Sequence, residues 1–435
     1  MFGTSGIRGI YGKDITEALA CRIASIFAEG ELVLGRDIRE SGPMLVSACA
    51  RGASAAGSAT IDLGVLPTPT VALATKKRGC RGIMVTASHN PPEYNGLKLI
   101  EAGKEIGKPL EREITEKYRA GGGSGYGAAA AEAARYHDRS IIDDHKSLVC
   151  SLVDGAAISK KKPKVIVDCN GAGSAITPSL LADLGCRVIS LNASLSCFNR
   201  PSEPRPESVP YMPALVRDAG ADLAILHDGD GDRCVVLDER GEMVPQDAQL
   251  AAMASHELVL GRGKVVSTVE ASLTVREAVE DAGGEMDITP VGSTFVGDRL
   301  EEAGAVFGGE PAGEYIYSKG VHVPDGVLAA AKFAEIFCSR GRLSAIRERY
   351  PQHPMAREKF RARDKAAAME RITREVAIEG TVRADDGIRV DEEDGWFLIR
   401  ASGTEPVVRL TMEYKDAKKL ERRKSELSAL ISRLL

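Results

Sequence analysis

The stretch "KVIVDCNGAGSAITPSLLADLGCRVISLN", residues 164–192, contains the pattern that decides the fold. The apolar run Lys164–Asp168 is typical of a buried strand, and a polar loop follows it. An amphipathic segment then runs to a glycine stop at Leu184–Gly185, and a second apolar run, Arg187–Asn192, comes directly after. Strand, helix and strand in this order predict a βαβ unit on a largely parallel sheet.

The same pattern occurs in two other parts of the chain. One unit starts with the apolar run Glu31–Gly35 and reaches its glycine at Gly57, before the apolar "ATIDLG". The other starts at Lys264–Val269 and stops at Gly283–Gly284. Units this far apart indicate duplicated domains, because the repeats of a solenoid are much shorter. We therefore expect three related α/β domains in tandem, although unrelated α/β domains would contain similar units.

The last part of the chain has a different pattern. Between Gly380 and Tyr414, short alternating strands are joined by Asp-Gly turns, and residues 415–435 have the pattern of an amphipathic helix. This predicts a smaller α+β domain with an antiparallel sheet. Breaks at the Gly/Ala-rich stretch from Ala120, at Val244–Pro245 and at Tyr350–Pro354 complete the division. The expected domains are residues 1–147, 148–245, 246–349 and 350–435.

The composition narrows the class of protein. A chain of 435 residues that is 43% hydrophobic can bury several cores. Its formal net charge of -5 gives no reason to expect nucleic acid or an anionic membrane as a partner, because both favour a basic surface. Nine cysteines without a C-x-x-C pair favour a reducing cytoplasm over a disulfide framework or a zinc site. No signal-peptide core or membrane-length apolar run is present, so we expect a soluble cytoplasmic protein.

The first chemical motif is "TASHNPPEYNGLK", residues 86–98. Ser88 follows the strand-like run Ile83–Thr86, and ligands of parallel sheets bind beyond the carboxyl ends of strands. Ser88 therefore stands where a nucleophile would be. A serine at this place can also be a simple turn or cap residue. No G-x-S-x-G elbow surrounds it, which argues against an esterase.

The second motif is "DGDGDR", in which Asp228, Asp230 and Asp232 alternate with glycines between two apolar strands. Carboxylates at this spacing repel one another unless a cation binds them, and oxygen-only ligands indicate Mg²⁺. An EF-hand is excluded because Arg233 stands where that loop needs glycine and the flanks are strands. Arg233 is then a natural phosphate or substrate ligand. A plain Asp/Gly turn is the alternative.

Three further stretches carry polar residues of interest. "VFGGEPAGEYIY" holds Glu310 in a glycine-rich loop, where a carboxylate suits neighbouring sugar hydroxyls. "FGTSGIRG" at the start contains Arg8 and is a weaker candidate for an anion-binding loop. "LIRASGTEPVVRL" has the composition of a phosphate cradle, with the alternative of a solvated hairpin. Its candidate residues are Arg400, Ser402, Gly403, Thr404 and Arg409.

Taken in order, "FGTSGIRG", "TASHNPPEYNGLK", "DGDGDR", "GGEPAG" and "RASGTEPVVR" resemble the α-D-phosphohexomutase family, which includes phosphoglucomutase/phosphomannomutase and phosphoglucosamine mutase. The match covers essentially the whole chain. The resemblance implies four domains around a central cleft, three of them sharing a mixed α/β core. It also implies a hexose phosphate as substrate, hexose 1,6-bisphosphate as activator, and a monomer or homodimer.

The resemblance further implies residue roles. Ser88 would be carried as phosphoserine, and Asp228, Asp230 and Asp232 would bind one Mg²⁺ together with the phosphoryl oxygen on Ser88. Lys98 would be the general acid/base, aided by His89, while Arg8 and Arg233 would stabilise phosphoryl charge. Glu310 would hold the sugar, and the "RASGT" loop with Arg409 would bind the distal phosphate. A phosphoryl group would then move between the 6- and 1-positions through a bisphosphate that turns end for end.

The sequence departs from the family at the sugar-binding positions. Ala312 stands where many members have serine, and Ser293 and Thr294 stand where relatives often have a His-Lys or Asp-Arg pair. The start "FGTSGIRG" is more similar to phosphoglucosamine mutases, so glucosamine 6-phosphate to glucosamine 1-phosphate is the first choice of reaction. The alternatives are a broad phosphoglucomutase/phosphomannomutase, a phosphatase that passes the phosphoryl group to water, and a catalytically silent sugar-phosphate sensor.

Overall fold

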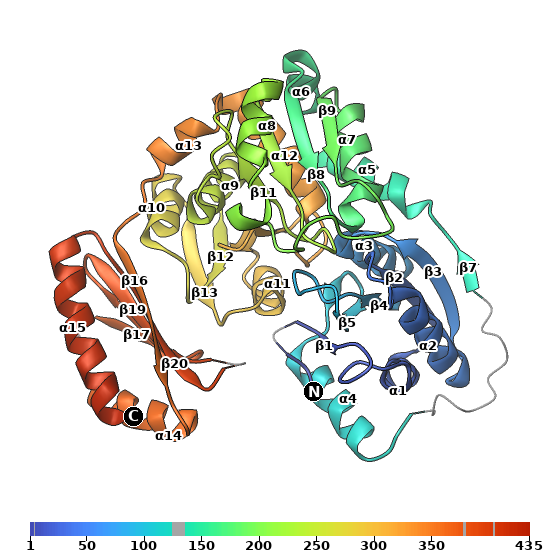
Figure 1. Ribbon diagram of the computed structural model, residues 1–435, viewed down its shortest axis with the longest axis horizontal. Coiled ribbons are helices and arrows are strands. Elements are labelled where there is room, and N and C mark those ends of the chain that lie inside the picture. The colour runs from blue at the N-terminus through green and yellow to red at the C-terminus, as the bar shows by residue number, and fades with distance from the viewer. Residues whose placement is uncertain (4, 124–134, 377–379, 403–404) are drawn as a thin grey trace.

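The computed structural model describes residues 1–3, 5–123, 135–376, 380–402 and 405–435, and it has four sheets with their covering helices (Figure 1). The predicted fold class is confirmed: three mixed α/β sheets precede an antiparallel one. Most of the Gly/Ala-rich insertion predicted from Ala120 lies outside the described residues.

The N-terminal sheet has seven strands in the order β1-β5-β4-β2-β3-β7, with β6 paired to β5. Its strands are β1 (Ile7–Ile10), β2 (Glu31–Arg36), β3 (Ala59–Val65), β4 (Arg81–Val85), β5 (Tyr94–Glu101), β6 (Lys104–Glu105) and β7 (Arg135–His137). The helices of this part are α1 (Glu17–Phe27), α2 (Gly42–Ala55), α3 (Thr68–Arg78) and α4 (Lys108–Arg119). Alternate residues of β4 point to opposite faces of the sheet: Ile83 and Val85 pack in the core on one face, and Met84 packs in the core on the other.

The second and third sheets have four strands each, in the orders β11-β10-β8-β9 and β13-β12-β14-β15. The second unit contains α5 (Ile141–Leu152), α6 (Gly155–Lys161), β8 (Lys164–Asp168), η1 (Ala172–Ala175), α7 (Thr177–Asp183), β9 (Arg187–Leu191), η2 (Pro206–Ser208), α8 (Met212–Ala219), β10 (Leu223–Leu226) and β11 (Val235–Leu237). The third contains α9 (Gln246–Leu260), β12 (Lys264–Thr268), α10 (Leu273–Asp281), β13 (Glu285–Thr289), α11 (Ser293–Glu302), β14 (Phe307–Glu310), β15 (Glu314–Tyr317), α12 (Gly326–Arg340) and α13 (Ser344–Arg349).

These three sheets share one topology. In each, the first strand of the repeated unit (β2, β8 or β12) lies between two parallel neighbours, which are the second and third strands in chain order. A fourth strand (β5, β11 or β15) then pairs antiparallel with the third. The helix after each first strand ends at a glycine with positive φ: Gly57, Gly185 or Gly283. The structure therefore confirms three related α/β units.

The C-terminal part forms a five-stranded antiparallel sheet in the order β16-β20-β19-β18-β17. Its elements are β16 (Met355–Arg361), α14 (Lys365–Glu375), β17 (Thr381–Arg383), β18 (Ile388–Glu392), β19 (Gly395–Ala401), β20 (Val407–Tyr414) and α15 (Ala417–Leu434). Residues of both helices pack with the sheet in a core that is separate from the others. This agrees with the smaller α+β domain predicted from the alternating pattern.

The cores show which units are joined. One continuous hydrophobic cluster includes residues of β8 and β10 in the second sheet and of β12 and β14 in the third. Helix α12 contacts α5, α6 and α7 on one side and α9 on the other, and its residues from Gly326 to Phe337 are all buried. The second and third units therefore share a core, whereas the first and the last have their own.

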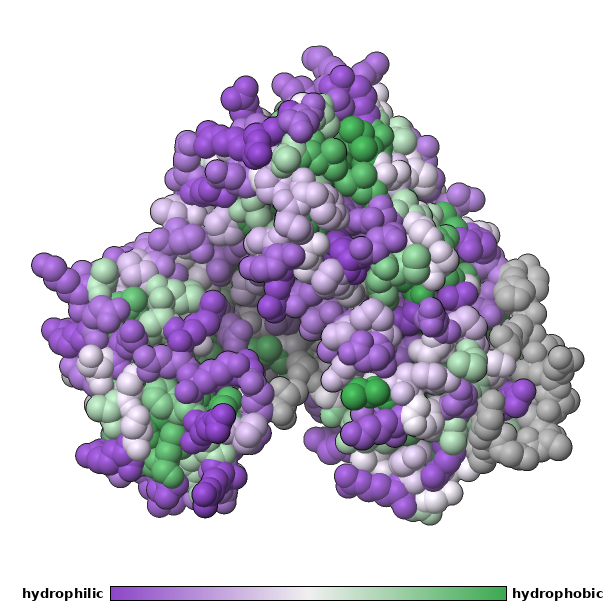
Figure 2. Space-filling view, in the orientation of Figure 1, coloured by the Kyte–Doolittle hydropathy of each residue, from purple (hydrophilic) through white to green (hydrophobic). Residues whose placement is uncertain are grey.

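The C-terminal sheet meets the third unit through a small mixed interface. Trp396 and Leu398 of β19 pack with Val269 and Leu273. The Trp396 indole Nε1 and the Leu273 amide both donate to Glu413 Oε2, at 2.8 and 2.7 Å. The two lower lobes in Figure 1 are this sheet and the first domain, and Figure 2 shows the molecular surface hollowed between them. Among the described residues, none of the helices combines the length and apolar composition needed to cross a membrane.

We expect the substitution Trp396→Phe to destabilise this interface. It removes a hydrogen bond to a buried carboxylate, and such a bond contributes about 1.5 to 3 kcal/mol. Thermal and urea unfolding should show a loss in this range. The control is Val382→Ala in the same sheet, where the side chain is 40% exposed and the change should stay within about 0.5 kcal/mol. Equal stability of the two variants would contradict the assigned role of Trp396.

Candidate active site

The candidate site is built from three equivalent loops. In each related unit, the loop between the third and fourth strands carries one of the predicted motifs: residues 86–93 between β4 and β5, residues 227–234 between β10 and β11, and residues 311–313 between β14 and β15. All three loops line one cavity of about 540 Å³. Ser88, Asp232 and Ala312 each lie on its wall. The shared topology therefore brings together residues that are far apart in sequence.

Ser88 is held in a specific and unusual conformation. Its φ of 49° places it in the left-handed region, which a residue other than glycine adopts at a cost. The Ser88 hydroxyl donates to Asp228 Oδ2 at 2.8 Å, and His89 Nδ1 lies 3.5 Å from the same hydroxyl oxygen. The residue is 1% exposed. The predicted nucleophile thus points directly at the predicted metal site.

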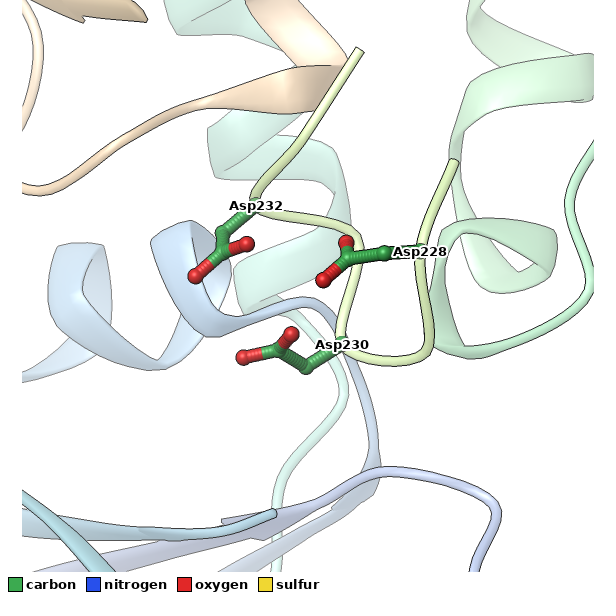
Figure 3. Close-up of side chains that lie close together, drawn as sticks. All are labelled: Asp228, Asp230 and Asp232. Carbon is green, nitrogen blue, oxygen red and sulfur yellow. The ribbon is translucent and has the colours of Figure 1, made fainter. Parts of the chain in front are cut away.

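The three aspartates converge on one point (Figure 3). One carboxylate oxygen from each of Asp228, Asp230 and Asp232 lies within 4.8 Å of the other two, and all three residues are buried. Asp230 Oδ1 and Asp232 Oδ1 accept no hydrogen bond from the described residues. Gly229 allows the close approach, because a Cβ there would lie 2.9 Å from the Ser88 carbonyl oxygen.

The electrostatics of the triplet fit a divalent cation. Burial, followed by the charges of Asp232 and Asp230, raises the pKa of Asp228 well above its usual value. Burial and the charge of Asp230 raise the pKa of Asp232 to about 6. Carboxylates that destabilise one another, with two buried oxygens free to bind, suit a hard cation such as Mg²⁺. The residues present therefore fit the predicted metal.

Lys98 places a positive charge in direct contact with two carboxylates of the triplet. It lies on β5 opposite Met84 of β4, and its Nζ contacts Asp230 Oδ2 at 2.9 Å and Asp232 Oδ2 at 2.5 Å. Burial lowers the pKa of Lys98, but these two carboxylates outweigh burial and hold the pKa above its usual value. Lys98 is therefore protonated in this arrangement. A cation bound by the same carboxylates would lower its pKa.

The other predicted catalytic residues surround Ser88. Burial, with the charges of Arg233 and Arg8, lowers the pKa of His89 to about 2, so its imidazole is neutral at physiological pH. Arg8 donates to Ser5 Oγ at 3.2 Å, while its buried Nε has no partner among the described residues. Arg233 donates to Glu314 Oε1 at 2.6 Å. These guanidinium groups create a positive environment beside Ser88 that suits a phosphoryl group.

The sugar-binding candidates lie on the opposite wall of the cavity. Glu310, Ala312 and Ser293 all line it, whereas Thr294 is buried at the start of α11 and is not part of the lining. Glu310 accepts a hydrogen bond from the Gly292 amide at 3.1 Å. Burial and the nearby charge of Glu314 raise the pKa of Glu310.

The predicted phosphate cradle lies apart from this cavity. Arg400 and Arg409 are directly opposite each other on β19 and β20, and like charges so placed repel unless anions lie between them. Here they pair with protein carboxylates: Arg400 with Glu270 at 2.9 Å and Arg409 with Glu405 at 2.6 Å. The third described member, Ser402, is 4% exposed, and its hydroxyl accepts a hydrogen bond from the Glu405 amide. Gly403 and Thr404 lie outside the described residues.

Comparison with known protein families shows which family the chain belongs to. Models described as "Phosphoglucomutase/phosphomannomutase, alpha/beta/alpha" domains I, II and III match residues 1–122, 142–241 and 245–353. The model of the C-terminal domain matches residues 355–430. The chain belongs to the phosphoglucomutase/phosphomannomutase family. It is thus a hexose phosphate mutase, as the motif order predicted.

Individual proteins extend the similarity over the whole chain. A Methanosarcina barkeri protein named "Probable phosphoglucosamine mutase" is 38% identical over 96% of this chain and 95% of its own. A phosphoglucomutase/phosphomannomutase family protein from Burkholderia thailandensis superposes with a TM-score of 0.85 at 26% identity, covering 100% of this chain and 98% of its own. The Aspergillus fumigatus N-acetylphosphoglucosamine mutase in complex with GlcNAc-6P and magnesium shares the fold, with a TM-score of 0.58 at 15% identity over 100% and 94% of the two chains.

Some residues of this phosphohexomutase site were not predicted from sequence. Thr68 donates to Asp230 Oδ2 at 2.5 Å, Ser202 Oγ donates to the Ser88 carbonyl at 2.9 Å, and Glu314 binds Arg233. Arg39 lies in "GRDIRESG", a polar loop that follows strand β2 just as the serine loop follows β4. The position of this loop beyond the carboxyl end of a strand is the sequence feature from which Arg39 could have been predicted.

We expect Asp232→Asn to separate metal binding from folding. Neutralising one of three repelling buried carboxylates should leave the metal-free thermal midpoint at pH 7 no lower than that of the wild type, while Mg²⁺ binding weakens by more than about tenfold. Thermal unfolding during a Mg²⁺ titration measures both quantities. The control is Asp183→Asn, whose side chain is 60% exposed and far from the triplet in the fold.

The same titration has a predicted pH dependence. The pKa of Asp232 is raised in the metal-free fold from 3.8 to about 6, so its contribution to stability is present below pH 3.8 and is lost as pH rises through about 6. A Mg²⁺ ion bound by the triplet would take the place of that proton above this range. The Mg²⁺-induced shift in midpoint should therefore shrink between about pH 7 and about pH 5. An equal shift at both pH values would count against metal binding by Asp232.

Proposed function

We propose that this phosphohexomutase interconverts glucosamine 6-phosphate and glucosamine 1-phosphate, with phospho-Ser88 as donor and acceptor and a 1,6-bisphosphate as intermediate. The observation that carries the proposal is the hydrogen bond of 2.8 Å from the buried Ser88 hydroxyl to Asp228, inside a carboxylate triplet that fits a cation. The left-handed conformation of a serine at such a site supports a role in phosphoryl transfer rather than in packing.

The proposed transfer moves one phosphoryl group and one proton. The phosphate of the sugar binds to Arg400, Ser402 and Arg409, with Gly403 and Thr404 completing the loop. The free sugar hydroxyl attacks phosphorus, and the bond between phosphorus and Ser88 Oγ breaks. The proton of the sugar hydroxyl passes to the general base and then to the released Ser88 oxygen, which becomes a hydroxyl again. Mg²⁺ held by the triplet would neutralise charge on the phosphoryl oxygens. The reverse transfer from the other end of the bisphosphate regenerates phospho-Ser88.

Lys98 is the proposed acid/base residue, with neutral His89 beside Ser88 as its aid. As found here, Lys98 is held protonated by Asp230 and Asp232, which suits proton donation. Its action as a base requires the lowered pKa that a bound cation would give. Arg8 and Arg233 would stabilise the charge of the transferred group.

The choice of sugar has two supports. The relative from Methanosarcina barkeri is named "Probable phosphoglucosamine mutase", and the match covers 95% of its length. Two carboxylates, Glu310 and Glu314, also line the cavity. A neutral hexose needs a carboxylate only as an acceptor for its hydroxyl groups. A second carboxylate suits the ammonium group of an amino sugar. Glu314 lies two residues after Ala312, on the same side of the cavity as the position where many family members have a serine hydroxyl.

The activator, the number of metal ions, the oligomeric state and the domain limits are proposed as expected from the sequence. Hexose 1,6-bisphosphate would be the activator, one Mg²⁺ would bind per chain, and the working unit would be a monomer or homodimer in the cytoplasm. The domain limits are proposed as residues 1–147 with the serine loop, 148–245 with the metal loop, 246–349 with the sugar loop, and 350–435 with the phosphate loop.

We expect a coupled assay with Mg²⁺ and glucose 1,6-bisphosphate to show preferred turnover of glucosamine phosphate over glucose, mannose and N-acetylglucosamine phosphates. Ser88→Ala should abolish isomerisation, while Ser151→Ala on the exposed face of α5 should retain it. Comparable turnover of glucose and mannose phosphates would identify a broad mutase instead. Release of inorganic phosphate without an isomer, undiminished in Arg400→Ala, would identify a phosphatase.

We expect Glu314→Gln to lower selectivity for the amino sugar. Glutamine can still accept the hydrogen bond from Arg233 but lacks the charge for an ammonium group. The ratio of kcat/KM for glucosamine phosphate to that for glucose phosphate should fall by roughly tenfold, which corresponds to about 1.4 kcal/mol. Glu302→Gln, on the outer face of α11 with a side chain 66% exposed, is the control. An unchanged ratio would mean that Glu314 does not recognise the amine.

A further inference from the structure

A buried arginine lies beneath the serine loop. Arg39 follows strand β2 and is 2% exposed. A guanidinium has five N–H groups in a fixed plane. The acceptors recorded for Arg39 are Asp37 Oδ2 (2.9 Å from Nε), the Pro91 and Tyr94 carbonyls (2.5 and 2.9 Å from one terminal nitrogen), and the Ser88 and Asn90 carbonyls (2.8 Å each from the other).

These contacts use the whole donor capacity of one side chain. The number of acceptors equals the number of N–H groups. Three of the acceptors are carbonyls of the loop that carries Ser88, and a fourth is the carbonyl of Tyr94, the first residue of β5. A single planar group therefore fixes the curvature of the chain from Ser88 to Tyr94. Lysine offers three donors in a tetrahedral array and cannot reproduce this set.

Arg39 is itself fixed by a second chain of hydrogen bonds that ends at Ser88. Asp37 accepts from Arg39 Nε and from the Arg39 amide, and its Oδ2 also accepts from Thr86 Oγ1 at 2.6 Å. Thr86 Oγ1 in turn accepts from the Ser88 amide at 2.8 Å. Both the amide and the carbonyl of Ser88 are thus held by one network that starts at the end of β2.

The second domain contributes to the same point. The Ser88 carbonyl accepts from Ser202 Oγ at 2.9 Å as well as from Arg39, and the Gly229 amide donates to Ser202 Oγ at 2.9 Å. Gly229 lies next to Asp228, whose carboxylate accepts the hydrogen bond from the Ser88 hydroxyl. Any rotation of the Ser88 peptide would therefore change the direction of its hydroxyl relative to the triplet.

We propose that Arg39 is a positioning residue for phosphoryl transfer: through the carbonyls between Ser88 and Tyr94 and the Asp37–Thr86 pair it holds Ser88 in its left-handed conformation, with Oγ directed at the metal-binding carboxylates. The inference rests on the proposed role of Ser88 as the phosphoryl carrier. Arg39 acts through the loop and contacts neither the triplet nor the sugar-binding wall of the cavity in the described structure.

The test compares Arg39→Lys with Arg389→Lys. Arg389 is equally buried, at 1% exposed, and also donates to two backbone carbonyls, Val269 and Ala271, but it lies at the C-terminal interface. Intact mass gives the rate at which Ser88 acquires a phosphate from glucose 1,6-bisphosphate. Thermal unfolding gives the loss of stability, and steady-state assays give kcat and KM.

We expect Arg39→Lys to slow phosphorylation of Ser88 and to lower kcat by about 100-fold, because small misplacements of a reacting group have effects of this size. KM for the monophosphate should change little, since the phosphate-binding residues lie in another domain. Arg389→Lys should lose similar stability and still acquire phosphate at a rate within about twofold of the wild type. Phosphorylation that falls equally in both variants, or in neither, overturns the inference.

A milder pair of variants tests the same network if Arg39→Lys does not fold. Thr86→Val removes the hydroxyl between Asp37 and the Ser88 amide, whereas Thr86→Ser restores it. We expect a loss of roughly tenfold in the phosphorylation rate for valine and recovery with serine. Equal phosphorylation rates in Thr86→Val and Thr86→Ser would overturn the inference about Arg39 and leave the proposed function standing. A wild-type chain that never acquires phosphate on Ser88 would overturn the proposed function and the inference with it.

Discussion

Three buried carboxylates within 4.8 Å of one another are the constraint on which the rest of the site depends. Such a group is unstable without positive charge nearby, and the fold supplies that charge from separate elements. Lys98 comes from β5, Arg233 follows the triplet itself, and Thr68 at the start of α3 donates a further hydrogen bond. The contacts between the first and second domains therefore include a direct response to one local concentration of charge, beside an apolar cluster that contains Ile38, Val65 and Ala172.

The site also shows how duplication generates chemistry. The connection between the third and fourth strands occurs three times in equivalent positions, and each copy contributes a different group. In the proposed function, the first would supply a nucleophile, the second a metal-binding triplet and the third a wall for the sugar. The sheets behind the loops supply rigid supports, because their strands are buried and hydrogen bonded. A cavity between three such loops obtains three kinds of group without any one loop being long.

The sequence allowed prediction of the residues that lie in short polar motifs directly after apolar strands. Ser88, the three aspartates and Glu310 all have this placement, and the repeated strand-helix-glycine pattern predicted the fold. Arg39 was missed because "GRDIRESG" is equally typical of an ordinary helix start, and its acceptors are backbone carbonyls, which have no sequence signature. The separation of Arg400 from the cavity depends on how β19 packs against the third domain, and no local pattern encodes that packing.

The equivalence of the three loops has an evolutionary consequence. Because each loop is supported by its own buried sheet, a substitution at the tip of one loop can change that loop without unfolding the sheet beneath it. Under the proposed function, the range of sugars could therefore diverge through a substitution at Ala312, while the serine and aspartate loops keep their residues. A change of substrate would then need a new residue at one turn and not a new enzyme.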